Sequence, residues 1–390
     1  MNYSSLFDNY QEFKEASLFG RYITQTDIAP LLEKHNDFCT IRQIGVSENK
    51  EPIHVITLGT GPLKVLGWSQ MHGNESTTTR ALFDFLNWIQ LDKNASIAKI
   101  ILKNCTLHFI PMLNPDGSRL YTRANFNNID LNRDAQNKSQ KEMQVFFDLV
   151  EEIKPDLVLN LHGQRTIFSV EQTDKKATVS FLSAAGDSER SLTDSRRKAM
   201  KLIANMNTTL QEFIPDGVGR YDDQFNINCT GDTFEYNKIP GILFEAGHYT
   251  HDYDREITRK LIFIALLKCI ETVSNQGLVM DGFEDYFKIP ENGKQFKDII
   301  IRNFEINGQK QDIAIHYKEE LRDGKLAFVP LIDTISKSIP EIGHMEWDAL
   351  KDQIVISTHN NVMNIGEEVK YLSINTNKFS IFPLKNPVNN

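Results

Sequence analysis

Residues 63–75, Leu-Lys-Val-Leu-Gly-Trp-Ser-Gln-Met-His-Gly-Asn-Glu, join a short apolar run to a histidine and a glutamate three positions apart. The apolar part, 63–68, has the length and composition of a buried strand. His72 and Glu75 follow closely, so one tight turn can direct both side chains inward. Such a pair can supply two of the three protein ligands that a catalytic zinc requires, with one position left open for water. The spacing alone is common in proteins, so its meaning depends on the sequence downstream.

Strands and helices alternate along most of the chain. We expect strands at 40–45, 53–58, 63–68, 106–112, 156–161, 178–184 and 242–244, and helices at 76–90, 139–154, 194–213 and 254–273. This order predicts an α/β fold with a mixed, mostly parallel central sheet flanked by helices. Four polar residues come just after an expected strand: His72, Asn114, His162 and Glu245. Because sites in such sheets lie at the carboxyl ends of the strands, this shared placement predicts one functional site.

The pattern changes near residue 277. Short runs at 299–301, 312–317, 327–329 and 354–356 alternate with turn residues and predict a small β-rich C-terminal domain. A chain of 390 residues is long enough for one large domain and a smaller one. We therefore expect a catalytic domain over 1–277 and an accessory domain over 278–390, with the chemistry in the first.

Composition excludes several classes of function. The chain is 40% hydrophobic and 24% charged, with a net charge of -9, so it offers no basic surface for nucleic acid or anionic lipid. Its first twenty residues lack a basic segment and an apolar run, and no stretch reaches the length of a membrane span, so we expect a cytoplasmic protein. The four cysteines are widely spaced without a Cys-x-x-Cys pair, which indicates reduced thiols: Cys39, Cys105, Cys229 and Cys269.

A third zinc ligand should be a neutral imidazole from a distant strand. His162, in Leu-Asn-Leu-His-Gly, fits that requirement. The segment Glu245-Ala-Gly-His248-Tyr-Thr-His251 can also be read as a metal cluster, so this alternative stays open. Glu245 ends an apolar strand, where a carboxylate is unfavourable unless it is paired or functional. Beside a metal-bound water, such a carboxylate would act as a general base.

The polar segment 123–134, Arg-Ala-Asn-Phe-Asn-Asn-Ile-Asp-Leu-Asn-Arg-Asp, suggests anion recognition. Guanidinium groups bind carboxylates through two parallel hydrogen bonds, and asparagine supplies a further donor. Asp130 can accept the outer N–H of a ligating histidine and so fix its tautomer. An exposed polar loop is the alternative interpretation of this segment.

Together these motifs resemble the zinc carboxypeptidase (carboxypeptidase A-like) family over about residues 40–275. The resemblance rests on five elements in that family's order: His72-Gly-Asn-Glu75, Asn114-Pro-Asp-Gly, Arg123 with Asp130-Leu-Asn132-Arg133, Leu-His162-Gly and Phe-Glu245. It implies that one zinc ion is bound by His72, Glu75 and His162, with Glu245 activating a water molecule. It also implies that Arg123 stabilises the oxyanion, that Asn132 and Arg133 hold the substrate carboxylate, and that Asp130 orients His72.

The chain departs from that family's pattern in three respects. Asp134 and Ala135 follow Asn132-Arg133, where the family usually has Asn or Trp with an aromatic residue, so a different specificity pocket is expected. Tyr221 precedes Glu245 by 24 residues and is our candidate for the family's mobile tyrosine. Asp232 would favour a basic substrate side chain if it lies in the pocket. The β-rich tail is not part of the shared catalytic domain.

Three hypotheses about function follow. The first is a zinc metallocarboxypeptidase that hydrolyses the C-terminal amide bond of peptides. The second is a zinc-dependent deacylase of N-acyl amino acids that resembles aspartoacylase and succinylglutamate desuccinylase, which also carry a C-terminal β domain. In both cases the substrate, a peptide or a small acylated amino acid, has a free carboxylate. The third is a binding module without catalysis, and the change Glu245→Gln separates it from an enzyme because only an enzyme would lose turnover.

Overall fold

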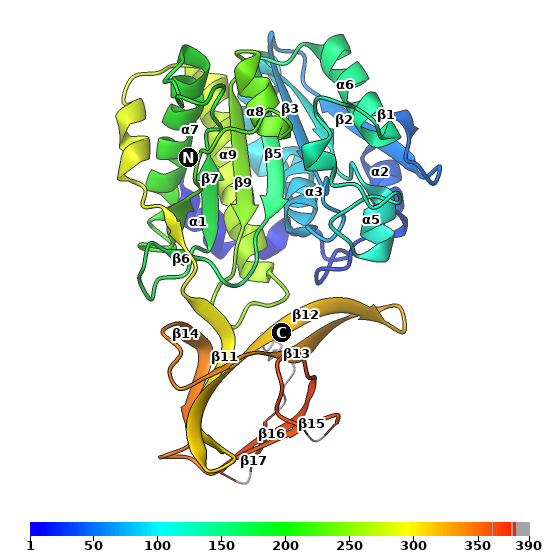
Figure 1. Cartoon of the computed structure of the whole chain (residues 1–390). Coiled ribbons are helices and arrows are strands. Elements are labelled where there is room, and N and C mark those ends of the chain that lie inside the picture. Colours follow the sequence, from blue (N-terminus) through cyan, green and yellow to red (C-terminus); the bar gives the residue numbers. More distant parts are fainter. Residues whose placement is uncertain (361, 376, 380–390) are drawn as a thin grey trace. The chain divides into compact units, whose positions relative to one another are not determined.

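The computed structural model describes residues 1–360, 362–375 and 377–379 (Figure 1). The chain folds into two compact units. The first unit contains 1–164, 177–247 and 255–292, and the second contains 165–176, 248–254 and the described residues from 293 onward. The expected domains, 1–277 and 278–390, remain a prediction, and the end of the second range, 380–390, lies outside the described residues.

An eight-stranded sheet forms the centre of the first unit. Its strands are β1 (Thr40–Val46), β2 (Pro52–Leu58), β3 (Leu63–Ser69), β4 (Cys105–Ile110), β5 (Leu157–Gly163), β7 (Val179–Leu182), β8 (Val218–Arg220) and β9 (Gly241–Ala246). The spatial order is β1-β2-β4-β3-β5-β9-β7-β8. The four central strands β4, β3, β5 and β9 are parallel to one another, whereas the pairs β1–β2, β2–β4 and β7–β9 are antiparallel. The predicted α/β class, with a mixed and mostly parallel central sheet, is confirmed.

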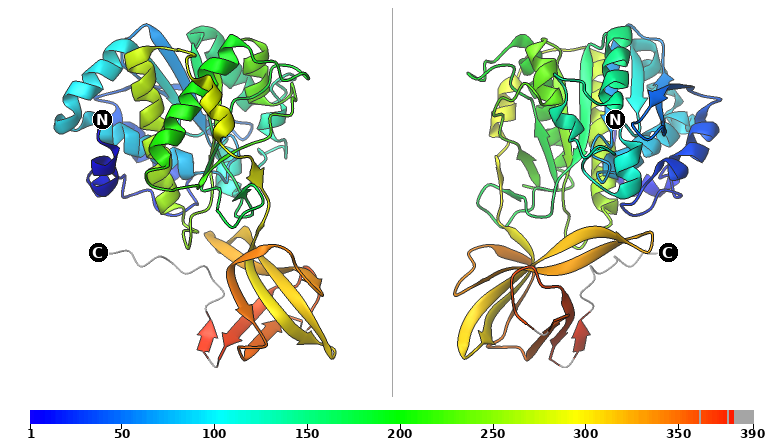
Figure 2. Two further views of the ribbon diagram at one scale, coloured as in Figure 1. Left: turned by 90° about the vertical axis from the view of Figure 1, so that its left-hand side faces the viewer. Right: turned by 45° about the vertical axis from the view of Figure 1, so that its right-hand side comes forward.

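Helices cover both faces of this sheet (Figures 1 and 2). The helices of the first unit are α1 (Tyr3–Asp8), α2 (Gln25–His35), α3 (Thr77–Gln90), α4 (Ala95–Asn104), α5 (Pro115–Leu120), α6 (Lys141–Ile153), α7 (Asp194–Leu210), α8 (Thr230–Tyr236) and α9 (Glu256–Gln276), with short 3-10 turns η1 (Tyr10–Glu12), η2 (Asp92–Asn94), η3 (Leu131–Arg133) and η4 (Phe283–Lys288). Successive side chains of β2 pack on opposite faces of the sheet. Ile56 belongs to the core that contains residues of α3, α7 and α9, and Val55 belongs to the core that contains residues of α6.

Two central strands run slightly further than the sequence indicates. β5 continues through His162 to Gly163, and β9 continues through Glu245 to Ala246. In the parallel register His162 is paired with Glu245. These two residues are therefore held side by side by backbone pairing at the carboxyl end of the sheet.

A buried ion pair connects two of the covering helices. The Arg259 guanidinium in α9 donates to both carboxylate oxygens of Asp84 in α3, at 2.7 and 2.5 Å. Its remaining donors reach the backbone oxygens of Leu18 and Glu15. Arg259 and Asp84 are both fully buried, so removal of Arg259 would leave a buried carboxylate without the cation that pairs with it.

The second unit is rich in β structure. One sheet contains β11 (Phe296–Ile306), β12 (Gln309–Arg322), β13 (Lys325–Ser336) and β14 (Ile342–Asp348), in the order β13-β12-β11-β14, and the other contains β15 (Ile354–Thr358), β16 (Val369–Ile374) and β17 (Asn377–Phe379). The strands β6 (Ser169–Val170) and β10 (Asn292–Gly293) are two residues long. Isoleucines of β11 and β12 pack with Leu372 of β16 in a common core. The predicted β-rich C-terminal region is thus confirmed.

Across the described residues, no helix is both long enough and apolar enough to span a lipid bilayer.

Candidate active site

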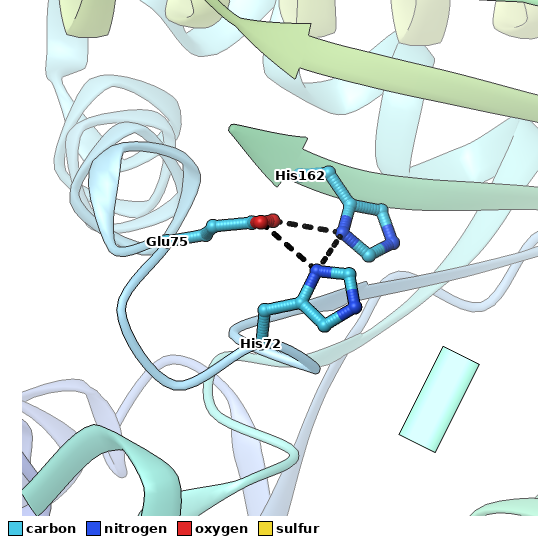
Figure 3. Close-up of side chains that lie close together, drawn as sticks. All are labelled: His72, Glu75 and His162. Carbon is cyan, nitrogen blue, oxygen red and sulfur yellow. Dashed lines mark hydrogen bonds and ion pairs between the residues drawn. The ribbon is translucent and has the colours of Figure 1, made fainter. Parts of the chain in front are cut away.

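Three side chains meet at the carboxyl ends of adjacent parallel strands. His72 lies in the turn between β3 and α3, Glu75 lies two positions before α3, and His162 lies near the end of β5. Figure 3 shows that their polar atoms point toward one another. Among the described residues this is the group whose donor atoms converge closely enough for a metal ion, and it includes neither His248 nor His251. The alternative metal cluster around those two histidines is therefore not supported.

The distances within this group are short. His72 Nδ1 lies 3.0 Å from His162 Nδ1. One oxygen of Glu75 lies 2.9 Å from His72 Nδ1, and the other lies 2.8 Å from His162 Nδ1. The backbone N–H of Gly163 donates to the same second oxygen at 3.0 Å. The Nδ1 atoms of His72 and His162 and the carboxylate of Glu75 therefore converge on a common point.

This donor set fits zinc. Two imidazoles and one carboxylate are a typical catalytic zinc set, and ligand atoms about 2.0–2.2 Å from a tetrahedral ion lie roughly 3.3 Å apart. The separations of 2.8–3.0 Å between the donor atoms are slightly shorter than that, and a small expansion would accommodate the ion. Two imidazole nitrogens that face each other also need a cation or a shared proton between them. Three protein ligands leave a fourth position for water or substrate.

Asp130 fixes the orientation of His72. Its Oδ1 atom lies 3.1 Å from His72 Nε2, on the side of the ring opposite Glu75. If Nε2 carries the proton and donates it to Asp130, Nδ1 keeps its lone pair for the metal. Asp130 is itself held by Arg123 Nε at 3.0 Å and by the Asn132 backbone N–H at 2.9 Å.

Gly73 lets the ligand turn approach α5 closely. A Cβ atom at this position would lie 2.0 Å from the Gly117 carbonyl carbon and 2.1 Å from the Ser118 nitrogen. Real Cβ atoms do not approach backbone atoms that closely, so the turn could not keep this position with any larger residue. This contact explains physically why glycine follows His72, and it places the end of the Asn114-Pro-Asp-Gly117 segment against this turn.

The ionisable groups of the trio influence one another. Burial alone would lower the pKa of His72, but the charge of Glu75 and the hydrogen bond to Asp130 raise it above its usual value. Burial would raise the pKa of Glu75, but His72 and His162 hold it well below its usual value. Burial and the nearby charge of His72 lower the pKa of His162. The site thus favours an ionised Glu75 and a neutral His162, which are the forms that bind a metal.

Glu245 lies beside this group on β9. Burial and the charge of Glu75 raise its pKa well above the usual value, and the positive charges of Arg123 and Arg255 oppose that rise. Its Oε2 atom is buried and makes no hydrogen bond to the described residues. A carboxylate with a raised pKa and a free oxygen is suited to accept a proton from a nearby water.

The expected anion-binding residues line the same edge. Arg123 Nη1 lies 3.2 Å from His72 Nδ1, and about half of the Arg123 side chain is exposed. The Asn132 side-chain oxygen accepts the Thr230 backbone N–H at 3.0 Å, which leaves its amide NH2 group as a donor for a ligand. Arg133 is exposed and donates to the Asn132 carbonyl at 2.8 Å. The chain thus brings the Arg123 guanidinium group close to His72 and Glu75.

Asp232 lies near Arg133, at the start of α8. Burial raises its pKa to about 6, against the hydrogen bond from the Asn226 N–H and the charge of Arg133. Asp134, in contrast, uses both carboxylate oxygens within its own loop, where it accepts from Ser139 and from the Gln140 N–H. Asp134 therefore has a local structural role.

Tyr221 lies on a different part of the sheet from the strands that carry this group. It follows β8, two strands away from β9 in the sheet, and its backbone N–H donates to the Phe181 carbonyl at 3.0 Å. Its assignment as the mobile tyrosine remains a prediction. Two contributors to the site were not anticipated from the sequence. The backbone N–H of Gly163 binds Glu75, and a backbone contact cannot be identified from a sequence. The charge of Arg255 acts on Glu245, but in the sequence Arg255 is an ordinary residue at the start of a helix.

The comparisons with known proteins identify the family. A family model described as zinc carboxypeptidase matches residues 25–241, which is more than half of the chain. The chain therefore belongs to the zinc carboxypeptidase family, a family of peptide hydrolases. The match ends four residues before Glu245, so the assignment of that residue rests on the geometry of β9.

Two curated proteins with similar sequences are named as carboxypeptidases. The chain is 26% identical over 265 residues to Carboxypeptidase SOL1 of Arabidopsis thaliana, covering 62% of this chain and 52% of that protein. It is 28% identical over 156 residues to Carboxypeptidase E of Caenorhabditis elegans, covering 33% of this chain and 32% of that protein. The chain thus spans about half or less of the length of these curated relatives.

Solved structures share the fold. A metallo-carboxypeptidase from Burkholderia cenocepacia has a TM-score of 0.51 at 17% identity, covering 64% of this chain and 70% of that chain. Carboxypeptidase A from Helicoverpa armigera has a TM-score of 0.51 at 14% identity, covering 70% of this chain and 81% of that chain. These similarities support the α/β architecture of the first unit.

Proposed function

We propose that this chain is a zinc-dependent metallocarboxypeptidase that removes the C-terminal residue of peptides by hydrolysis. The observation that carries the proposal is the convergence of His72, Glu75 and His162 beside Glu245, in a member of the zinc carboxypeptidase family. The outer contact between His72 and Asp130 supports it further, because ligating histidines usually have such a partner.

Each site residue would have one chemical task. Zinc, held by His72, Glu75 and His162, would supply a Lewis acid for the scissile carbonyl and for water. Glu245 would accept the proton of the attacking water and pass it to the leaving amine. Arg123 would donate to the oxygen that becomes negative in the transition state, a contribution of about 3 kcal/mol in comparable sites.

Recognition of the chain end would involve a second set of residues. Asn132 and Arg133 would bind the free α-carboxylate, because an amide NH2 group and a guanidinium fork match its two oxygens. Tyr221 would close over the bound residue. Asp232 would attract a basic substrate side chain above its pKa of about 6. The expected substrate is therefore a peptide with a free C-terminal carboxylate.

A paired digestion tests this proposal. The zinc-loaded protein is incubated with a peptide library that has free C-termini and with the same library amidated, and N-acetyl and N-succinyl amino acids are added to both. Mass spectrometry should show loss of single C-terminal residues from the free library alone. The zinc-loaded Glu245→Gln variant, prepared identically, should release nothing, which excludes a contaminating peptidase.

The other outcomes would contradict the proposal. Cleavage of both libraries would show that the free carboxylate is not recognised. Cleavage of the acylated amino acids with both libraries intact would assign the protein to the N-acyl amino acid deacylases instead. Equal turnover by the Glu245→Gln variant would remove Glu245 from the mechanism.

A further inference from the structure

Arg255 has an unusual environment immediately before α9. Its side chain is buried, with 1% of its surface exposed, although an arginine is rarely buried without a specific partner. Its backbone φ of 60° lies in the left-handed region, which residues other than glycine, asparagine and aspartate seldom adopt. Both features need a compensating interaction, and the contacts of its guanidinium group supply one.

The guanidinium group binds the ends of two central strands. Its Nη1 atom donates to the Ala246 carbonyl at 3.2 Å, and its Nη2 atom donates to the Gln164 carbonyl at 3.0 Å. Ala246 follows Glu245 directly on β9, and Gln164 is the second residue after His162 at the end of β5. A single planar group therefore bridges the two strands that carry a metal ligand and the proposed base.

Strand pairing ends at this point of the sheet. The last paired residues are Gly163 on β5 and Ala246 on β9, and the Gln164 N–H still donates to the Ala246 carbonyl at 3.0 Å. Beyond them, the carbonyl of Gly247 is bound by the Thr258 hydroxyl of α9 at 3.0 Å. Thr258 thus holds the segment that follows β9, while Arg255 binds both the end of β9 and the residue after β5.

Geometry and charge favour arginine at this position. A guanidinium fork can donate to two carbonyl oxygens at fixed separation, whereas a lysine ammonium acts as a single point. The positive charge of Arg255 also opposes the rise in the pKa of the nearby Glu245 carboxyl that burial causes. Neither contact involves the metal ligands themselves.

We propose that Arg255 is a positioning residue, which fixes the carboxyl ends of β5 and β9 so that Glu245 stays opposite His162. This inference rests on the proposed peptidase function for its kinetic consequence. Its structural consequence, the arrangement of His162 around a bound metal, is independent of which substrate the enzyme cleaves.

The test compares Arg255→Met and Arg255→Lys with a matched control, Arg259→Met. Arg259 lies four positions along on α9, is also buried, and donates to Asp84 and to two backbone carbonyls away from the metal ligands. Both methionine variants lose a buried guanidinium group, so both should have a lower melting temperature. Only the Arg255 variants should change the arrangement of His162 and Glu245.

Kinetics on a peptide with a free C-terminus should then separate the two arginines. Arg255→Met should lower kcat about 10-fold to 100-fold per zinc-loaded molecule with little change in KM, the scale of a displaced catalytic group. Arg255→Lys should recover part of that loss, and Arg259→Met should keep the parent kcat. An unchanged kcat in either Arg255 variant, or an equal loss in Arg259→Met, would overturn the inference. If Arg255→Met does not fold, Arg255→Lys decides the question.

A spectroscopic measurement keeps the inference testable without turnover. In the cobalt-substituted proteins, the visible absorption bands report the geometry of the metal ligands. Arg255→Met should shift these bands and weaken zinc binding, because His162 is no longer fixed by the end of β5, while Arg259→Met should match the parent. Identical cobalt spectra in Arg255→Met and the parent would contradict the positioning role. Absence of peptidase activity in the parent protein itself would contradict only the proposed function.

Discussion

Asp130 offers the sharpest mutational test of the metal site. The change Asp130→Ala removes the hydrogen bond of 3.1 Å between Asp130 Oδ1 and His72 Nε2, and with it the group that selects the tautomer of His72. The loss of such an outer partner typically weakens metal binding about 10-fold to 100-fold. That range corresponds to about 1.4–2.7 kcal/mol of binding free energy.

Competition with a chromophoric chelator at neutral pH would measure the zinc dissociation constant. The matched control is Asp134→Ala, which removes a buried carboxylate from the same loop whose acceptor bonds go to Ser139 and Gln140. This control should lower stability and leave zinc affinity unchanged. Zinc binding within about twofold of the parent in Asp130→Ala, well below the range expected for a lost outer partner, or equal weakening in both variants, would refute the reasoning.

Three further predictions concern protons and packing. Zinc binding near neutral pH should release protons, since the metal displaces them from His72 and lowers the raised pKa of Glu245. Calorimetry in buffers of different ionisation enthalpy should find that the Glu245→Gln variant releases fewer protons than the parent, and an equal number would contradict the contribution of Glu245. The pKa of Asp232 rises from 3.8 to about 6 on folding, so the neutral form is favoured in the folded state and stability is lost as pH rises through that range. Asp232→Asn should therefore raise the free energy of unfolding by up to about 3 kcal/mol at pH 8, with little gain below pH 4, and a gain that is independent of pH in denaturant titrations would contradict it. Gly73→Ala should abolish zinc binding or folding because its Cβ would overlap the Gly117 backbone, and a crystal structure with the ligand turn unchanged would disprove that explanation.

Much of the site was predictable from the sequence because its chemistry is local. His72 and Glu75 share one turn, and Asp130, Asn132 and Arg133 lie within four positions of one another. The meeting with His162 followed from the rule that parallel strands end at the same edge of a sheet. The fold class followed similarly from the alternation of elements.

Short helices were harder to predict. α4, Ala-Ser-Ile-Ala-Lys-Ile-Ile-Leu-Lys-Asn, contains several isoleucines, whose helix propensity is only moderate. α8 contains a glycine and two threonines, and it is stabilised by Phe234, which packs against Trp68 and Phe146. In both helices, tertiary packing overrides weak local preferences.

Arg255 could not have been predicted from the sequence. The two carbonyl groups that it binds belong to residues 91 and nine positions away, and backbone carbonyls carry no sequence signature. Its neighbours on both sides are acidic, and the sequence indicates only that it lies at the start of a helix. Roles that depend on the ends of distant strands become visible only in the folded chain.

The most direct test of the central claim is a zinc titration of the metal-free protein, with release of the C-terminal residue from a free peptide followed at each step. Activity should rise linearly to one equivalent of zinc and then stay constant. The Glu245→Gln variant should bind the same single equivalent without turnover. Full activity without zinc, or a Glu245→Gln variant that is as active as the parent at one equivalent, would contradict an enzyme in which His72, Glu75 and His162 hold the metal and Glu245 moves the proton.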